Sequence, residues 1–141
     1  MIDDTPRGVH WSFWVIGAIA LIWNGLGVAN FLMQMNPDSL SAYRESERLI
    51  IDGRPLWATA AFAVAVFGGT IGALLLLLRR SVAFYLFAAS LFGVLVTMSH
   101  TLGNGIEFGL GEILGIILAP VVVAAFLTWY STLTERKGWI S

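Results

Sequence analysis

The order of apolar and polar residues divides the chain into four long apolar runs separated by polar stretches. Each run has about 20 residues, the length that an α-helix needs to cross a hydrocarbon core about 30 Å thick. A helix also satisfies its own backbone hydrogen bonds, as lipid requires. The pattern therefore predicts a single-domain, all-α, integral membrane four-helix bundle over residues 1–141. The expected spans are about Trp11–Met33, Leu56–Leu78, Val82–Leu102 and Leu110–Tyr130.

The stretch between the first two runs, Asn36–Pro55, is the longest polar segment between spans. It begins with Asn-Pro-Asp, a typical helix start, and ends with a proline suited to start the second span. Between them, a largely apolar set of residues recurs at helical spacing, with charged residues opposite: Leu40, Tyr43, Glu47, Ile50 and Ile51. This predicts a short amphipathic helix lying on the outer membrane surface. The alternative is a solvated connector without such a helix.

Composition supports a membrane protein and narrows the classes of function. Hydrophobic residues make up 57% of the chain and charged residues 12%, against averages of roughly 45–50% and about 25% in soluble proteins. A soluble domain of this size could not bury so much apolar surface, so lipid is expected to cover it. The net charge of −1, without a basic block, argues against a nucleic-acid partner. The lack of cysteine excludes disulfides, thiol catalysis and thiolate metal sites.

The basic residues near the span ends predict the orientation in the membrane. Arg7, the Arg79–Arg80 pair, Arg136 and Lys137 would lie on one side of the bilayer. The other side would carry three arginines, all in the first loop and interleaved with acidic residues. Because short cytoplasmic loops are enriched in Lys and Arg, both termini are expected in the cytoplasm and the first loop in the periplasm. The first run spans about 20 residues and no clear small-residue cleavage site follows it, so we expect an uncleaved signal anchor.

The stretch Thr97–Gly115 contains the most unusual polar groups, because His100 and Glu112 fall inside apolar runs. An ionisable side chain at membrane depth is costly unless it is paired or hydrated, so it marks a candidate functional site. Four further polar or aromatic side chains share the periplasmic third of the bilayer. The predicted ligand-binding set is therefore Asn24, Asn30, Arg54, Trp57, His100 and Glu112. The opposite half has few polar side chains, which favours a pocket open to the periplasm over a continuous pore.

Five of these residues, all except Arg54, also have a structural interpretation. His100 could simply bond a carbonyl of a neighbouring helix, and Glu112 could cap the positive end of the fourth span. The two asparagines could hold helices together, and Trp57 could be an interfacial aromatic. Small residues recur four apart at Gly68/Gly72, Ala89/Gly93 and Gly111/Gly115, a spacing that allows close helix packing.

Catalytic chemistry and bound metals are not expected. His10 and His100 would lie on opposite sides of the membrane, so no site can take two histidines. Ser99 precedes His100, but adjacent residues on a helix do not face each other, so they cannot act as a nucleophile and its base. No phosphate-binding glycine loop is present. We therefore expect a protein that is not an enzyme and has no cofactor.

The run IIDGRPLWATAAFAVAVFGGTIGALLLLLRRSVAFYLFAASLFGVLVTMSHTL resembles a group of small bacterial inner-membrane proteins with four spans. The segment WNGLGVANFLMQMNP in the first span fits the same group, so the resemblance covers nearly the whole chain. Members are often labelled sugar transporters, which implies transport. Two hypotheses follow. The protein binds or transports a small polar solute, working as a homo-oligomer, or it is a non-catalytic subunit of a larger membrane complex.

Overall fold

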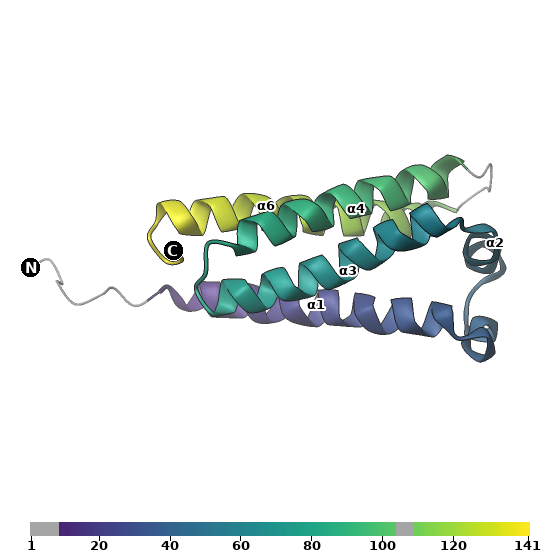
Figure 1. The fold of residues 1–141 in the computed structure, drawn as a ribbon, viewed down its shortest axis with the longest axis horizontal. Helices are drawn as coiled ribbons and strands as arrows, with labels where there is room; N and C mark the ends of the chain where they lie inside the picture. Colours follow the sequence, from purple (N-terminus) through teal and green to yellow (C-terminus); the bar gives the residue numbers. More distant parts are fainter. Residues whose placement is uncertain (1–8, 104–108) are drawn as a thin grey trace, which may run out of the picture.

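The computed structural model describes residues 9–103 and 109–141. Those residues form helices and no strands, so the all-α prediction is confirmed. Three single helices form the first three spans: α1 (Trp11–Met35), α3 (Leu56–Leu77) and α4 (Ala83–Gly103). The fourth span runs from Leu110 to Arg136, and all four are long and apolar enough to cross a membrane. Figure 1 shows them side by side as a bundle, with both termini at one end. The protein is a multi-pass membrane protein.

The fourth span is distorted near its start. It consists of α5 (Leu110–Glu112), a π-helical segment η2 (Ile113–Leu118) and α6 (Ala119–Arg136). The backbone N–H of Ala119 bonds the carbonyl of Leu114, five residues earlier. Pro120 follows directly, and a proline lacks an N–H and collides with the carbonyl four residues before it. Pro120 therefore disturbs the regular α-helical hydrogen bonds, and the backbone before it forms a π-helical segment.

The fourth span also ends six residues later than expected, because α6 continues to Arg136. The extra turns contain Ser131 and Thr134, which are fully buried. Ser131 Oγ donates to the Thr128 carbonyl at 2.7 Å, and Thr134 Oγ1 donates to the Ser131 carbonyl at 3.0 Å. Backbone carbonyls of the same helix thus accept the hydrogen bonds of these hydroxyls, so both residues can be buried within a helix.

Glycines set the closest approach of the central helices. A Cβ added at Gly93 of α4 would lie 2.6 Å from the Ala61 carbonyl oxygen and 2.9 Å from the Ala65 amide nitrogen of α3. The expected small-residue pairs Gly68/Gly72 and Ala89/Gly93 thus contribute glycines to the α3–α4 contact, where a Cβ at Gly72 would press on Phe87. By contrast, no atom of the described residues lies within 4 Å of a Cβ at Gly111 or Gly115. That third pair makes no close packing contact.

The end of the bundle that carries the termini, called here the termini end, is tightly filled. Phe13, Leu76 and Phe87 are almost fully buried there in one apolar cluster. The segment after α6 turns back into this cluster and buries Ile140. It pairs with the turn between α3 and α4, because the Ser81 N–H bonds the Ser141 carbonyl at 3.0 Å. This packing closes the termini end of the bundle interior.

The first loop crosses the opposite end, called here the loop end (Figure 1). It contains a 3₁₀ helix, η1 (Pro37–Ala42), and then α2 (Glu45–Gly53), so the predicted loop helix is present. The Asn36 side chain caps η1 by accepting a bond from the Asp38 N–H at 3.1 Å, as the sequence pattern indicated. Residues of α2 reach the bundle interior, so this helix covers the loop end of the bundle in addition to facing outward.

Candidate functional site

The bundle contains a cavity of about 460 Å³ that begins at the loop end. This volume lies within the range of roughly 300–1,000 Å³ typical of small-molecule sites. All four spans and α2 contribute side chains, and most of the lining is apolar. The lining residues are Trp23, Asn24, Leu26, Gly27, Asn30, Gln34, Glu47, Ile51, Arg54, Phe62, Ala65, Val66, Phe87, Ser90, Val94, Thr97, Met98, Thr101, Gly115, Pro120, Val123, Ala124 and Leu127.

Polar groups concentrate at the loop end of this cavity. The Tyr43 hydroxyl donates to the Asn30 side chain and also lies 3.3 Å from the Asn30 carbonyl. The Gln34 side chain lies beside the same hydroxyl, and Glu47 and Arg54 are close enough to influence it electrostatically. We call these five residues the loop-end cluster. Burial raises the pKa of the Tyr43 hydroxyl above its ordinary value, and the Glu47 carboxylate adds to the increase.

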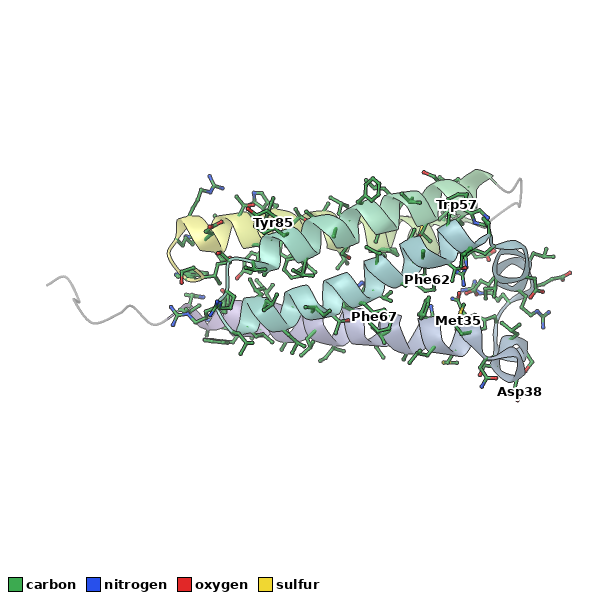
Figure 2. All side chains as sticks on the ribbon, in the orientation of Figure 1. Met35, Asp38, Trp57, Phe62, Phe67 and Tyr85 are labelled. Atoms are coloured by element: carbon green, nitrogen blue, oxygen red, sulfur yellow. The ribbon has the colours of Figure 1, made fainter. Side chains whose placement is uncertain are left out.

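Arg54 is the residue of the cluster whose hydrogen bonding is least complete. Its Nε and Nη2 atoms are buried and have no hydrogen-bond partner among the described residues. The guanidinium lies over the Phe62 ring, 5.0 Å from its centroid, a cation–π contact that holds it in place. Burial lowers the pKa of Arg54 from its ordinary value, although an arginine stays protonated at physiological pH. Figure 2 shows Phe62 on α3, partway between Trp57 and Phe67.

The acidic neighbour does not neutralise this arginine. Glu47 Oε1 accepts a bond from Arg44 Nε at 3.1 Å, so its carboxylate is already paired outside the cavity. The other unsatisfied group of the cluster is neutral: Gln34 Oε1 is buried without a partner among the described residues. The loop end of the cavity therefore presents a positive guanidinium with two spare N–H groups beside an unsatisfied amide.

Deeper polar groups are satisfied by backbone carbonyls. Asn24 Nδ2 donates to the Ala20 carbonyl at 2.8 Å, and Ser90 Oγ donates across the helix contact to the Ala65 carbonyl at 2.6 Å. Thr97 Oγ1 donates to the carbonyl one turn earlier at 2.8 Å. These groups use their hydrogens within the bundle. The deep part of the cavity is accordingly apolar, with a few oxygen atoms that can accept a hydrogen bond.

The cavity reaches the lipid-facing surface between α1 and α6. Helix packing follows chain order, since α1 packs on α3, α3 on α4 and α4 on α6. Between the first and last of these helices lies an apolar groove of about 300 Å³. Its residues Trp23, Val123 and Leu127 also line the cavity. Trp23 is 40% exposed and the neighbouring cavity residue Leu26 is 65% exposed. These shared and exposed residues make the groove, called here the α1–α6 seam, the candidate side opening of the cavity.

The structure brings three of the six predicted site residues to this cavity. Asn24, Asn30 and Arg54 line it, at three different depths. Each also has a structural contact. Asn24 bonds its own helix, Asn30 accepts from Tyr43, and Arg54 caps α2 through its backbone N–H. Their role as ligand-binding residues stays a prediction.

The other three predicted residues lie outside the described lining of the cavity. Trp57 is 56% exposed and meets the edge of His100, with ring centroids 5.5 Å apart. The Gly109 N–H donates to Glu112 Oε1 at 3.3 Å, so Glu112 caps the start of the fourth span. Both His100 and Glu112 have further interactions.

Gln34, Tyr43 and Glu47 complete the site and were not among the predicted binding residues. The sequence placed Gln34 near the end of the first span and the other two on the polar loop. Their contribution depends on how the loop folds across the bundle, which hydrophobic spacing does not encode. The helical spacing of Glu47 and Ile51 was a useful indication, because it places both on one side of α2, whereas Tyr43 precedes that helix and reaches the cluster through the turn after η1.

The residues that line the cavity are suited to binding a ligand. Among the described residues, no three His, Asp or Glu side chains lie together as a metal site would require. A positive group at one end of an apolar chamber can hold a negative or strongly polar group while the rest of a ligand is buried. No family model matches the chain, and no curated protein or solved structure matches it. The resemblance to four-span inner-membrane proteins therefore stays a prediction.

Proposed function

We propose that this membrane protein binds a small solute in the cavity beneath α2. The observation that carries the proposal is Arg54, whose buried Nε and Nη2 atoms have no partner in the described chain and line that cavity. A buried charged donor without a hydrogen bond is costly, whereas a bound acceptor would satisfy it. The tightly filled termini end favours a binding pocket over a through-going pore.

In this proposal the loop end faces the periplasm of a bacterium and both termini lie in the cytoplasm. The support is the distribution of basic residues, since Arg79, Arg80, Arg136 and Lys137 all lie at the termini end. A periplasmic loop end would give solutes access to the cluster around Arg54. Binding is the first step of uptake, and transport would require a further opening at the termini end.

Filling the cavity tests the proposal. Val94 is 8% exposed and lines the cavity, whereas the next residue, Leu95, is 47% exposed on the outer face of α4. Native mass spectrometry of the purified protein should detect a bound small molecule on wild type and on Leu95→Phe. Val94→Phe should lose it, because the larger ring occupies the binding volume. Val123→Phe fills the same cavity from α6 and serves as a second variant.

Two results would contradict the proposal. Bound mass that persists in both Val94→Phe and Val123→Phe would place the small molecule elsewhere on the protein. If no bound small molecule is detected on wild type or on any variant, there is no ligand to assign to the cavity. Circular dichroism and a single symmetric elution peak establish that each variant is folded before the comparison is made.

A non-catalytic subunit of a larger membrane complex is the second candidate function. The observation that favours it is exposed Gly111, where no described atom lies within 4 Å of an added Cβ and a neighbouring helix could approach closely. Multi-angle light scattering of protein extracted in a mild detergent distinguishes the candidates. A protein mass of 15.3 kDa or a small multiple favours the binding protein. A larger assembly that contains other chains favours the subunit.

A further inference from the structure

We propose that the ligand is a single-chain amphiphile with an anionic head group, which enters from the membrane between α1 and α6. This inference rests on the proposed function and names the chemical class of its ligand. The head group would bind Arg54 at the loop end, and the hydrocarbon chain would lie along the apolar part of the cavity. A carboxylate and a phosphate share the chemistry that Arg54 recognises, because both accept two parallel N–H bonds from a guanidinium.

Charge at the loop end favours an anion. Arg54 offers two buried N–H atoms, and the nearest cavity carboxylate, Glu47, is bonded to Arg44 instead. A cationic head group would be repelled by Arg54. A neutral hydroxyl could accept one bond but would leave the positive charge without a counterion. The unsatisfied atom of Gln34 is Oε1, an acceptor, so a bound anion can bond this side chain only after the amide rotates to present its N–H₂.

The shape of the cavity favours a chain. It follows α1 from Gln34 to Trp23, about 16 Å at a rise of 1.5 Å per residue. Its volume of about 460 Å³ accommodates about 15 non-hydrogen atoms at roughly 30 Å³ each, the share of one water in the liquid. A head group with a hydrocarbon chain of about a dozen carbons matches this length and volume. A compact sugar would leave much of the apolar lining without contacts.

The route of entry follows from the position of the side opening. The α1–α6 seam is flanked by Trp23 and Leu26 on one helix and by Val123 on the other, all of them apolar. An amphiphile already dissolved in the bilayer can slide its chain through this seam without crossing water. Its head group stays at the level of the loop end, where Arg54 is located.

The binding experiment uses full-length protein in nanodiscs of zwitterionic phosphatidylcholine. Tritiated laurate, dodecyl phosphate and dodecanol are the three probes, with the same chain and different head groups. Wild type and Arg48→Gln should bind one or both anions saturably. Arg48 is the matched control, because it belongs to α2 but does not line the cavity. Arg54→Gln should weaken anion binding at least tenfold and leave the weaker dodecanol binding unchanged.

The outcomes separate the inference from the proposed function. Equal laurate and dodecyl phosphate affinity in wild type and Arg54→Gln would refute the anion site. Dodecanol binding as tight as that of the anions, lost in Val94→Phe, would refute the charge preference but retain the cavity as a binding site. Failure of all three probes would refute the amphiphile, and the native mass spectra would then decide the proposed function separately. Preference for laurate or for dodecyl phosphate would identify the carboxylate or the phosphate as the head group.

A photoreactive laurate that carries a diazirine on its chain tests the entry route in the same nanodiscs. Peptide mass spectrometry should locate labels on α1 and α6 residues that border the seam, such as Trp23 and Val123. Excess unlabelled laurate should remove these labels. Labels confined to the outer faces of α3 and α4 would refute entry through the seam.

Discussion

Gly93→Ala offers a direct test of the central helix contact. A Cβ at this position would lie 2.6 Å from the Ala61 carbonyl oxygen, whereas ordinary contact begins at 3.4 Å. Both neighbours of this Cβ on α3 are backbone atoms, which cannot rotate away. The helices must therefore separate locally by the difference, 3.4 − 2.6 = 0.8 Å. A gap of this size forfeits about a quarter to a half of the dispersion energy of each affected contact.

The magnitude follows from three contributions. Overpacking of a well-packed contact costs about 1–3 kcal/mol. The separation also lengthens the bond from Ser90 to the Ala65 carbonyl, and an interhelical hydrogen bond in a membrane protein contributes about 0.6 kcal/mol. Alanine offsets part of this through its higher helix propensity, by about 1 kcal/mol. The expected net loss for Gly93→Ala is therefore about 0.6–2.6 kcal/mol in the free energy of unfolding.

The assay is equilibrium unfolding in mixed micelles with increasing fractions of sodium dodecyl sulfate, followed by circular dichroism. Gly25→Ala is the matched control, because nothing lies within 4 Å of a Cβ at Gly25 on α1. It should leave stability unchanged or raise it by up to about 1 kcal/mol. The reasoning is refuted if Gly93→Ala is as stable as Gly25→Ala, since the two helices would then tolerate the added methyl group.

Three other experiments test the polar groups and the orientation. Tyr43→Phe should cost about 1 kcal/mol at neutral pH. Burial raises the folded-state pKa of Tyr43 above its ordinary value of 10.0. The stability that the Tyr43 hydroxyl contributes is therefore full below the unfolded pKa and is lost as pH rises through the folded pKa. Melting temperatures of wild type and Tyr43→Phe that differ equally at neutral and strongly alkaline pH would contradict this. His100 and Glu112 share a predicted depth and a predicted site, and if they pair there, the double change to Leu should cost less than the sum of the single changes, each about 3–5 kcal/mol. Additive detergent melting data within about 0.5 kcal/mol would mean independent roles. Cysteine at the exposed Asp38 should react with an impermeant thiol reagent outside intact cells and cysteine at Ser141 should not, whereas labelling of Ser141 alone would invert the orientation.

The spans could be predicted because lipid imposes a length and a composition that can be counted along the chain. The start of α1, the start of α3 and the cap of η1 by Asn36 agree with the sequence-based boundaries. The end of the fourth span could not be predicted in the same way. Ser131 and Thr134 are polar by composition, but their hydroxyls bond carbonyls of their own helix and are buried.

The candidate site could be predicted only in part. Depth along each span placed Asn30 and Arg54 at the same end of the bundle, and both line the cavity. Depth does not determine which way a side chain points around the helix axis, and His100 contacts Trp57 outside the described lining. The position of Tyr43 depends on the path of the loop across the bundle, which follows from tertiary packing and not from periodicity.

The order of helix packing has a consequence for how the protein is assembled. Each span packs on the span that precedes or follows it in the chain, so contacts are local in sequence. During insertion, every helix after the first would find its main partner already in the bilayer, and loop closure would cost little entropy. The α1–α6 seam differs, because it joins the first helix to the last and must wait for the complete chain. Late closure of that seam would allow a lipid-like guest to be enclosed while the protein is still being made.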